Sequence, residues 1–301
     1  MMGLKAIKTS RGKGAQTEFR RHSRLKEIWR RFRKNKLALA GLIVIIIIIV
    51  IAAAAPYLAP EGYDSQNIPD SLLRPGQKGY VLGTDNLGRD VLSRIIWGAQ
   101  YTLQCGVIAV LVSAVCGCSL GLVAGYYSGA IDNLIMRLMD ILLAIPGILL
   151  AICIAATLGP GMRNAIIAVG VSGTPAFARI VRSSVLTVRE MEYIEAAHAV
   201  NASDARIILT HILPNSLAPI LVQTTLSIAN AIMQTAALSF LGLGVQLPIS
   251  EWGAMISGAR PFFKNYSYLV TSPGIAIMLL VFSINIFGDG LRDALDPRLR
   301  R

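Results

Sequence analysis

Residues 37–55 read LALAGLIVIIIIIVIAAAA, and this uncharged run decides the class of the fold. At about 1.5 Å per helical residue, a run of this length spans roughly 30 Å, the thickness of the hydrocarbon core of a bilayer. The whole chain of 301 residues is 54% hydrophobic and 15% charged, with a mean hydropathy of +0.57. A soluble domain of this size carries about 25% charged residues. The sequence therefore predicts an integral membrane protein.

Further apolar segments of membrane length follow the first one. They lie at about 102–125, 136–158, 164–181, 216–241 and 269–288. We expect Pro146 to bend the third of the six segments, because proline removes a helical hydrogen bond. The predicted fold class is an all-α membrane protein with six transmembrane helices.

The distribution of Lys and Arg predicts the orientation. The first 36 residues carry thirteen Lys and Arg against two Glu, a net charge of +11 out of +12 for the chain. Basic residues flanking a first transmembrane helix stay in the cytoplasm, so six spans place both termini there. Arginines predicted on the same side are Arg179, Arg182, Arg189, Arg206, Arg292, Arg298, Arg300 and Arg301. We interpret the basic tail as a topology signal that meets anionic membrane lipid, and not as a nucleic-acid-binding segment.

These assignments divide the chain into five parts. They are a basic cytoplasmic N-terminal tail at 1–36, a first transmembrane helix at 37–55, an extracytoplasmic loop at 56–101, a core of five transmembrane helices at 102–290 and a cytoplasmic tail at 291–301. The core includes a long cytoplasmic loop at about 187–215.

That cytoplasmic loop has an unusual alanine-rich sequence with turn signals. A helix through Glu195-Ala196-Ala197 should break at Asn201, because Asn tolerates a left-handed conformation. Ser203 is placed to cap a second helix that begins at Asp204. The alternative is a plain polar linker between two spans.

The sequence lacks motifs for catalysis, metal binding or nucleotide binding. It contains no G-x-x-x-x-G-K-[ST], no HExxH and no GxSxG, and Cys116 and Cys118 point apart on a helix. We therefore expect no enzymatic activity, no metal site and no cofactor bound by this chain. The predicted spans hold few charged residues, which favours an external ATPase over ion coupling. A stand-alone channel or ion-coupled carrier remains the alternative.

Three motifs in one order resemble a known family. The spacing of Glu195-Ala196-Ala197, Asn201 and Leu213-Pro214 resembles the "EAA" coupling loop of ABC-importer permeases, which docks on the ATPase. LGTDNLGRDVLSR at 82–94 and GDGLRDALDPR at 288–298 are similar to permeases of peptide/nickel-type importers, specifically the C-type subunit. The resemblance covers the chain from about residue 29 onward. One departure is Asn201, where the family usually has Gly.

The resemblance implies a type I ABC importer permease fold that forms half of a translocation pathway. It implies as partners a second homologous permease, two ATPase subunits that bind ATP and Mg²⁺, and an extracytoplasmic binding protein. The delivered solute would be a dipeptide or oligopeptide, glutathione, nickel or a metal chelate. The outer motifs argue against an exporter. The implied coupling residues are Glu195, Ala196, Ala197, Asn201, Ser203, His211, Leu213 and Pro214.

The outer motif has two interpretations. Thr84, Asp85 and Arg89, with Glu251 and Trp252 of a later outer loop, are candidates for contact with the binding protein or for an outer gate. Alternatively, Thr84, Asp85 and Arg89 only build a capped turn that seats the next helix.

Two patterns within the spans predict contacts. Ser113, Gly117, Gly121 and Gly125 form a stripe of small residues on which another helix can pack closely. Gln223, Ser227, Asn230 and Gln234 fall at i, i+4, i+7 and i+11, on one face of the fifth span. Four polar side chains would be costly in lipid, so we expect them to line a watery path or to bond to neighbouring helices.

Overall fold

The computed structural model describes residues 24–295. Within this range the chain is helical, apart from loops and one isolated β-bridge between Thr84 and Asp90. Much of the basic tail and the arginines at 298, 300 and 301 lie outside the described residues. The long helices are α2 Lys36–Ala53, α4 Val91–Tyr127, α5 Gly129–Leu143, α6 Gly147–Leu158, α7 Met162–Arg189, α10 Leu213–Phe240 and α12 Tyr268–Leu295. The short ones are α1 Arg24–Phe32, α3 Ala55–Leu58, η1 Ile68–Asp70, η2 Gln77–Gly79, α8 Glu192–Ala199, α9 Asp204–Ile207, the π-turn η3 Ile208–Ile212, α11 Trp252–Ala259 and η4 Arg260–Phe262.

Among the described residues, five helical segments are long and apolar enough to cross a membrane, and the bent pair α5 and α6 gives six if the two helices together form one broken span. The bend predicted at Pro146 in the segment 136–158 is confirmed, but it is a complete break between two helices and not a bend within one helix. α5 ends at Leu143, α6 begins at Gly147, and the two helices are bent by 89°. Pro146 causes the break, because it has no N–H and disfavours helical geometry in the residue before it.

The second span begins earlier than expected. α4 starts at Val91 and not near 102, because the Asp90 carboxylate accepts hydrogen bonds from the backbone N–H groups of Leu92 and Ser93. The outer loop is correspondingly shorter than the predicted 56–101. At the other end of the chain, α12 continues to Leu295, so residues 291–295 are helical and do not form a separate tail.

The stripe of small residues on α4 packs against α7, as the sequence predicted. A methyl group built on Gly117 would lie 2.6 Å from the carbonyl oxygen of Thr174, and one on Gly121 would lie 2.5 Å from that of Ala178. Ser113 donates a hydrogen bond of 2.7 Å to the carbonyl oxygen of Gly170 on α7. The backbones of α4 and α7 therefore approach more closely than any residue larger than glycine at 117 and 121 would permit.

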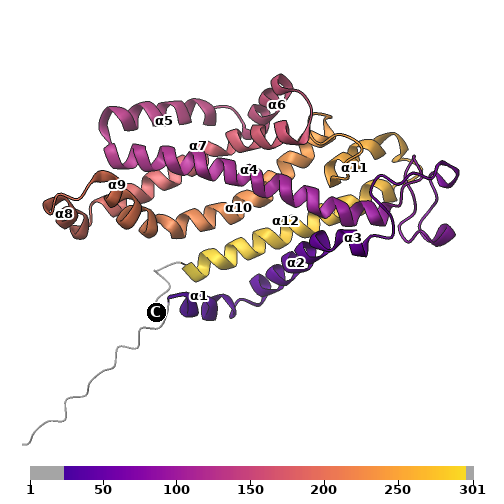
Figure 1. Cartoon of the computed structure of the whole chain (residues 1–301), viewed down its shortest axis with the longest axis horizontal. Coiled ribbons are helices and arrows are strands. Elements are labelled where there is room, and N and C mark those ends of the chain that lie inside the picture. The colour runs from indigo at the N-terminus through magenta and orange to yellow at the C-terminus, as the bar shows by residue number, and fades with distance from the viewer. Residues whose placement is uncertain (1–23, 296–301) are drawn as a thin grey trace, which may run out of the picture.

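The two ends of the bundle differ in what they carry (Figure 1). α8, α9, α1 and the end of α12 lie at one end, while the loop before α4 and the short helix α11 lie at the other. α1 packs on α12 through Phe32 and Phe287, whose ring centroids are 5.6 Å apart. The described ends of the chain therefore lie on the same side as the loop around Glu195, as the distribution of basic residues predicted.

The fifth span is longer than the sequence indicated. α9, the π-turn η3 and α10 run as one helical segment from Asp204 to Phe240. α10 packs against α4, α7 and α12, so this segment lies at the centre of the bundle.

The contact between α4 and α7 gives the first testable prediction. Gly121→Ala should lower the melting temperature of the purified protein, because the new methyl group meets a backbone oxygen; overpacking costs about 1–3 kcal/mol. Gly274→Ala on α12 is the matched control, since a methyl group there has no neighbour within 4 Å. Gly274→Ala raises the helix propensity by the same amount as Gly121→Ala does. A Gly121→Ala protein as stable as Gly274→Ala would contradict the packing argument.

Candidate functional site

The cytoplasmic loop is a compact unit with one buried side and one exposed side. Ile194 on α8, Ile207 on α9 and Ile212 in the π-turn are buried against the inner ends of α4 and α7. On the other side Glu195, Ala196, Asn201, Ser203 and Pro214 are exposed. Two of the predicted coupling residues do not lie on the exposed side. Ala197 is buried, and Leu213 packs against the same apolar cluster as the three isoleucines.

The turn after α8 has the backbone geometry expected at Asn201. The φ angle of Asn201 is 57°, in the left-handed region. Its N–H donates to the carbonyl oxygen of His198, and the N–H of Ala202 donates to that of Ala197. This pair of bonds is the Schellman motif, which ends a helix and satisfies its last carbonyl groups.

The start of α9 corrects one expectation. The helix begins at Asp204 with Ser203 at the N-cap position, but the Ser203 side chain makes no capping hydrogen bond. Asp204 is held instead from α4, since the Tyr126 hydroxyl donates a 2.7 Å hydrogen bond to Asp204 Oδ1. The first turn of this long helical segment is therefore tied to α4 by a contact that is distant in sequence.

The end of α7 is tied to the same place on α4. Arg189 Nη1 donates a hydrogen bond of 2.8 Å to the carbonyl oxygen of Tyr126 and another to Ser128 Oγ. The Tyr126 ring stacks over His198 with a centroid distance of 6.4 Å. Sequence reasoning missed Tyr126, because an aromatic residue at the end of an apolar span is an ordinary interfacial residue. Its role arises only from the fold.

His211 lies where the π-turn meets α10. Its ring is half-buried beside Tyr193, and its carbonyl oxygen accepts a 2.7 Å hydrogen bond from Asn215 Nδ2. Pro214 is at the start of α10, where its missing N–H disturbs the regular hydrogen-bond ladder, so the neighbouring π-turn has a local cause.

A hollow of about 450 Å³ lies beside α8, lined by residues of α8, the end of α7 and Ser128 after α4. Two carboxylates, Glu190 and Glu195, line it together with His198 and Arg189. Glu195 therefore faces a concave, partly acidic surface, whereas Glu192 is exposed outside it.

The polar face of α10 is partly open. Gln223 Nε2 donates a hydrogen bond of 3.1 Å to Ser227 Oγ within the helix. Gln234 Oε1 accepts a hydrogen bond of 3.4 Å from the Ser172 hydroxyl on α7. Asn230 is exposed, and its amide has no hydrogen-bond partner among residues 24–295. The face thus combines one bond to a neighbouring helix with side chains that remain accessible in the single chain.

At the opposite end of the bundle, the outer motif folds into a turn whose polar groups point inward. Thr84 is buried; its hydroxyl accepts a 2.9 Å hydrogen bond from the N–H of Leu73, and its carbonyl oxygen accepts one of 2.8 Å from the Tyr268 hydroxyl. Asp85 Oδ1 accepts from the N–H of Leu87, while Asp85 Oδ2 lies 2.7 Å from Nε of Arg89. The carboxylate therefore closes the turn that precedes α4.

Glu251 and Trp252 join α11 to α4. The fully buried Glu251 carboxylate caps α11 by accepting hydrogen bonds of 2.8 and 2.9 Å from the N–H groups of Gly253 and Ala254. Burial raises the pKa of this carboxyl, and the hydrogen bonds oppose that shift. Trp252 Nε1 donates 3.0 Å to the carbonyl oxygen of Ile95 on α4.

These positions correct the view of the outer residues as a contact surface. Thr84, Glu251 and Trp252 are interior groups that hold the loop, α4 and α11 together, so a docked protein would not touch them. Thr84, Asp85 and Arg89 do form a capped turn before α4, and contact of Asp85 or Arg89 with the binding protein stays a prediction.

The chain is similar to proteins of one transport family. A family described as "Binding-protein-dependent transport system inner membrane component" matches residues 117–301, and an "N-terminal TM domain of oligopeptide transport permease C" matches 23–75. A dipeptide transport system permease protein, DppC, from Alkalihalophilus pseudofirmus is 48% identical over 275 residues, which cover 91% of this chain and 90% of that protein. A glutathione transport system permease protein, GsiD, from Pectobacterium atrosepticum is 43% identical over 299 residues, covering 99% and 97%.

A solved structure of the MetNI methionine ABC transporter, in an inward-facing conformation, has a similar fold. It matches with a TM-score of 0.55 and 20% identity over 68% of this chain and 97% of that one. At this identity the likeness concerns the fold alone.

The hydrogen bond from Tyr126 to Asp204 gives a second prediction. Tyr126→Phe removes one bond to a charged acceptor, a loss of about 1.5–3 kcal/mol. Amide hydrogen exchange in α8 and α9 should therefore be faster by at least on the order of tenfold, because local opening becomes easier. Tyr127→Phe is the control, since Tyr127 is exposed. The effect should disappear in an Asp204→Ala background, which removes the acceptor of the hydrogen bond. Equal exchange in the two Phe variants would refute the prediction.

Proposed function

The chain belongs to the family of binding-protein-dependent transport system inner membrane components, and from this we propose that it forms half of a pathway that imports peptides or a related small solute. It is a multi-pass protein of the cell membrane and a permease subunit of an ABC importer. Its other half would be a second, homologous permease. Two ATPase subunits would supply energy, and an extracytoplasmic binding protein would deliver the solute.

The continuity of the cytoplasmic loop with the polar face carries this proposal. α9 and α10 form one helical segment, so a displacement of the loop is passed directly to Gln223, Asn230 and Gln234 in the membrane. The loop presents a capped helix, α8, whose exposed face suits docking of a soluble partner. In this mechanism ATP closes the two ATPases, the loops move, and the pathway changes from inward-facing to outward-facing.

The division of chemistry between subunits follows from the same residues. We propose that ATP and Mg²⁺ bind only in the partner ATPases and that this chain is non-catalytic. Glu195, Ala196, Asn201, Ser203 and Pro214 would form the docking surface. Ala197, His211 and Leu213 would support it from within, because these three are buried or half-buried.

The solute class is proposed from the relatives and from the polar face. Relatives are named for dipeptide and glutathione transport. Uncharged amides and hydroxyls such as Gln223, Ser227 and Asn230 can exchange hydrogen bonds with the backbone of varied peptides without a requirement for charge. The pathway itself would tolerate many solutes, and the binding protein would select among them.

Coupling is tested by reversing one charge. In the assembled complex, Glu195→Arg should abolish ATP hydrolysis stimulated by solute and binding protein while the permease remains inserted, because Glu195 lines the hollow beside α8. Glu192→Arg is the matched control on the same helix, outside the hollow, and should retain most of the stimulation. Equal losses of stimulated ATP hydrolysis in both variants would mean that only the net charge of the helix matters, and would contradict specific docking at Glu195.

The polar face is tested by cysteine accessibility after replacement of the four native cysteines. Cysteines at Asn230 and Gln223 should react with small hydrophilic thiol reagents, with rates that differ between the ATP-bound and nucleotide-free complex. Leu221 is the control, since it is exposed on the opposite side of α10 and should remain unlabelled in lipid. Absence of labelling at Asn230 in every nucleotide state, together with loss of the assembled complex, would show that the face packs against a neighbouring subunit.

A further inference from the structure

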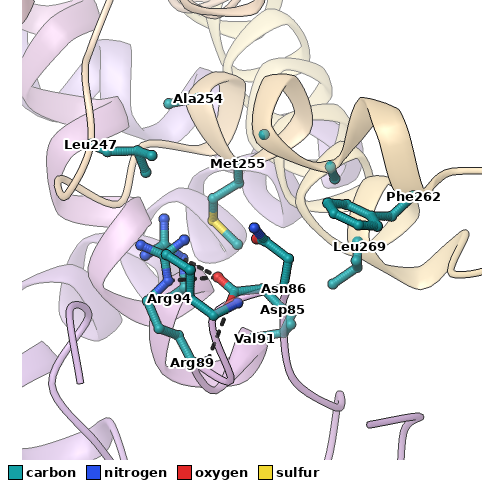
Figure 2. Close-up of a pocket in the computed structure, with 13 residues that line it drawn as sticks. Asp85, Asn86, Arg89, Val91, Arg94, Leu247, Ala254, Met255, Phe262 and Leu269 are labelled. Carbon is teal, nitrogen blue, oxygen red and sulfur yellow. Dashed lines mark hydrogen bonds and ion pairs between the residues drawn. The ribbon is translucent and has the colours of Figure 1, made fainter. Parts of the chain in front are cut away.

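A small cavity opens at the outer end of the molecule, between the turn before α4 and the elbow that joins α11 to α12 (Figure 2). Its volume is about 150 Å³. The walls are mainly apolar, and one side is charged. The apolar lining consists of Leu87, Val91, Leu247, Ala254, Met255, Ala259, Phe262 and Leu269, and the polar lining of Asp85, Asn86, Arg89 and Arg94.

The lining of the cavity carries two arginines and one carboxylate on its charged side. Arg89 and Arg94 are almost fully buried, with side chains 5% and 3% exposed, and both line the cavity. Asp85 is the single carboxylate in the lining, and its Oδ2 lies 2.7 Å from Nε of Arg89 and 3.7 Å from Nε of Arg94. Asp64, also near Arg94, is not part of the lining.

Hydrogen-bond donors remain free on this side. Arg94 Nη1 donates 2.9 Å to the carbonyl oxygen of Tyr63. Among residues 24–295, no group accepts a hydrogen bond from either terminal nitrogen of Arg89. Its Nε and its backbone N–H both donate to Asp85. These terminal N–H groups are therefore available to a group that enters the cavity. A carboxylate fits this position, because it pairs with the planar fork of arginine.

The size of the cavity limits what can enter. A cavity of about 150 Å³ holds a molecule the size of benzene, which corresponds to one side chain and excludes a whole peptide. Apolar walls with a guanidinium on one side suit a short methylene stem that ends in a carboxylate. None of the lining residues belongs to α10 or to its polar face, so the cavity is separate from the proposed solute path.

We propose that this cavity receives one acidic side chain, Glu or Asp, from the extracytoplasmic binding protein when it docks. The proposal rests on the proposed function, because it requires a binding protein that docks at this end. The exposed Asn86 and Leu247 at its margin are accessible to such a partner. Arg89 would then have two roles: it would fix the turn through Asp85 and bind the acidic side chain of the docked protein.

The experiment measures binding of the cognate binding protein to the assembled transporter in nanodiscs. Gly258 lines the cavity and has open space beside it, so Gly258→Leu adds a side chain at the cavity wall and keeps both arginines. Arg89→Gln removes the charge. Each variant should weaken binding at least tenfold, and Arg89→Gln should also reduce its dependence on ionic strength. Gly274→Leu, on an open face of α12, should keep the wild-type affinity.

A second measurement identifies the partner's side chain. Acidic surface residues of the binding protein are changed to amides one at a time, and one of them should weaken binding to the wild-type transporter but not to Arg89→Gln. Wild-type affinity in Gly258→Leu would overturn the docking site and leave the proposed function intact. A defect of Gly258→Leu confined to solutes with a free carboxylate would assign the cavity to the solute and overturn the proposal. Absence of any stimulation of the wild-type complex by the binding protein would overturn both.

Discussion

The close contact between α4 and α7 is the constraint on which the rest of the structure depends. Gly117 and Gly121 bring the two backbones so near that carbonyl oxygens of α7 occupy the space of a side chain. With this distance set, Arg189 at the end of α7 reaches the carbonyl oxygen of Tyr126 at the end of α4. Tyr126 can then hold Asp204. The position of the coupling loop is therefore a consequence of helix packing inside the membrane.

α4 also transmits this constraint to the outer end. Its first residues are capped by Asp90, and Thr102 bonds to both Glu251 and Trp252 of the α11 segment. A single long helix thus carries the anchor of the cytoplasmic loop at one end and the supports of the outer loops at the other. This arrangement supplies a mechanical link between the two faces of the membrane without a flexible joint in α4.

Hydropathy and turn chemistry were sufficient to predict much of the fold. The number of spans, the close packing of the glycine stripe and the left-handed turn at Asn201 depend on local composition, which the sequence displays. The break at Pro146 was only partly predicted, since the same proline permits either a bend or a complete break. Thr84, Glu251 and Trp252 were misjudged, because a polar residue in a loop gives no local sign that distant segments will bury it. Tyr126 has no sequence signal at all, since its partner lies in another segment of the chain.

The length of α4 has a consequence for where solute leaves the protein. A helix from Val91 to Tyr127 measures about 55 Å at 1.5 Å per residue, whereas a bilayer with its headgroups is about 40–45 Å thick. The segment from Asp204 to Phe240 has the same number of residues. At tilts below about 30° both segments project further than the bilayer with its headgroups, so part of each lies beyond the lipid. Under the proposed function, the inner extension would hold the ATPase-docking surface away from the headgroups, and a solute leaving the pathway would first enter the space between the bilayer and the ATPases.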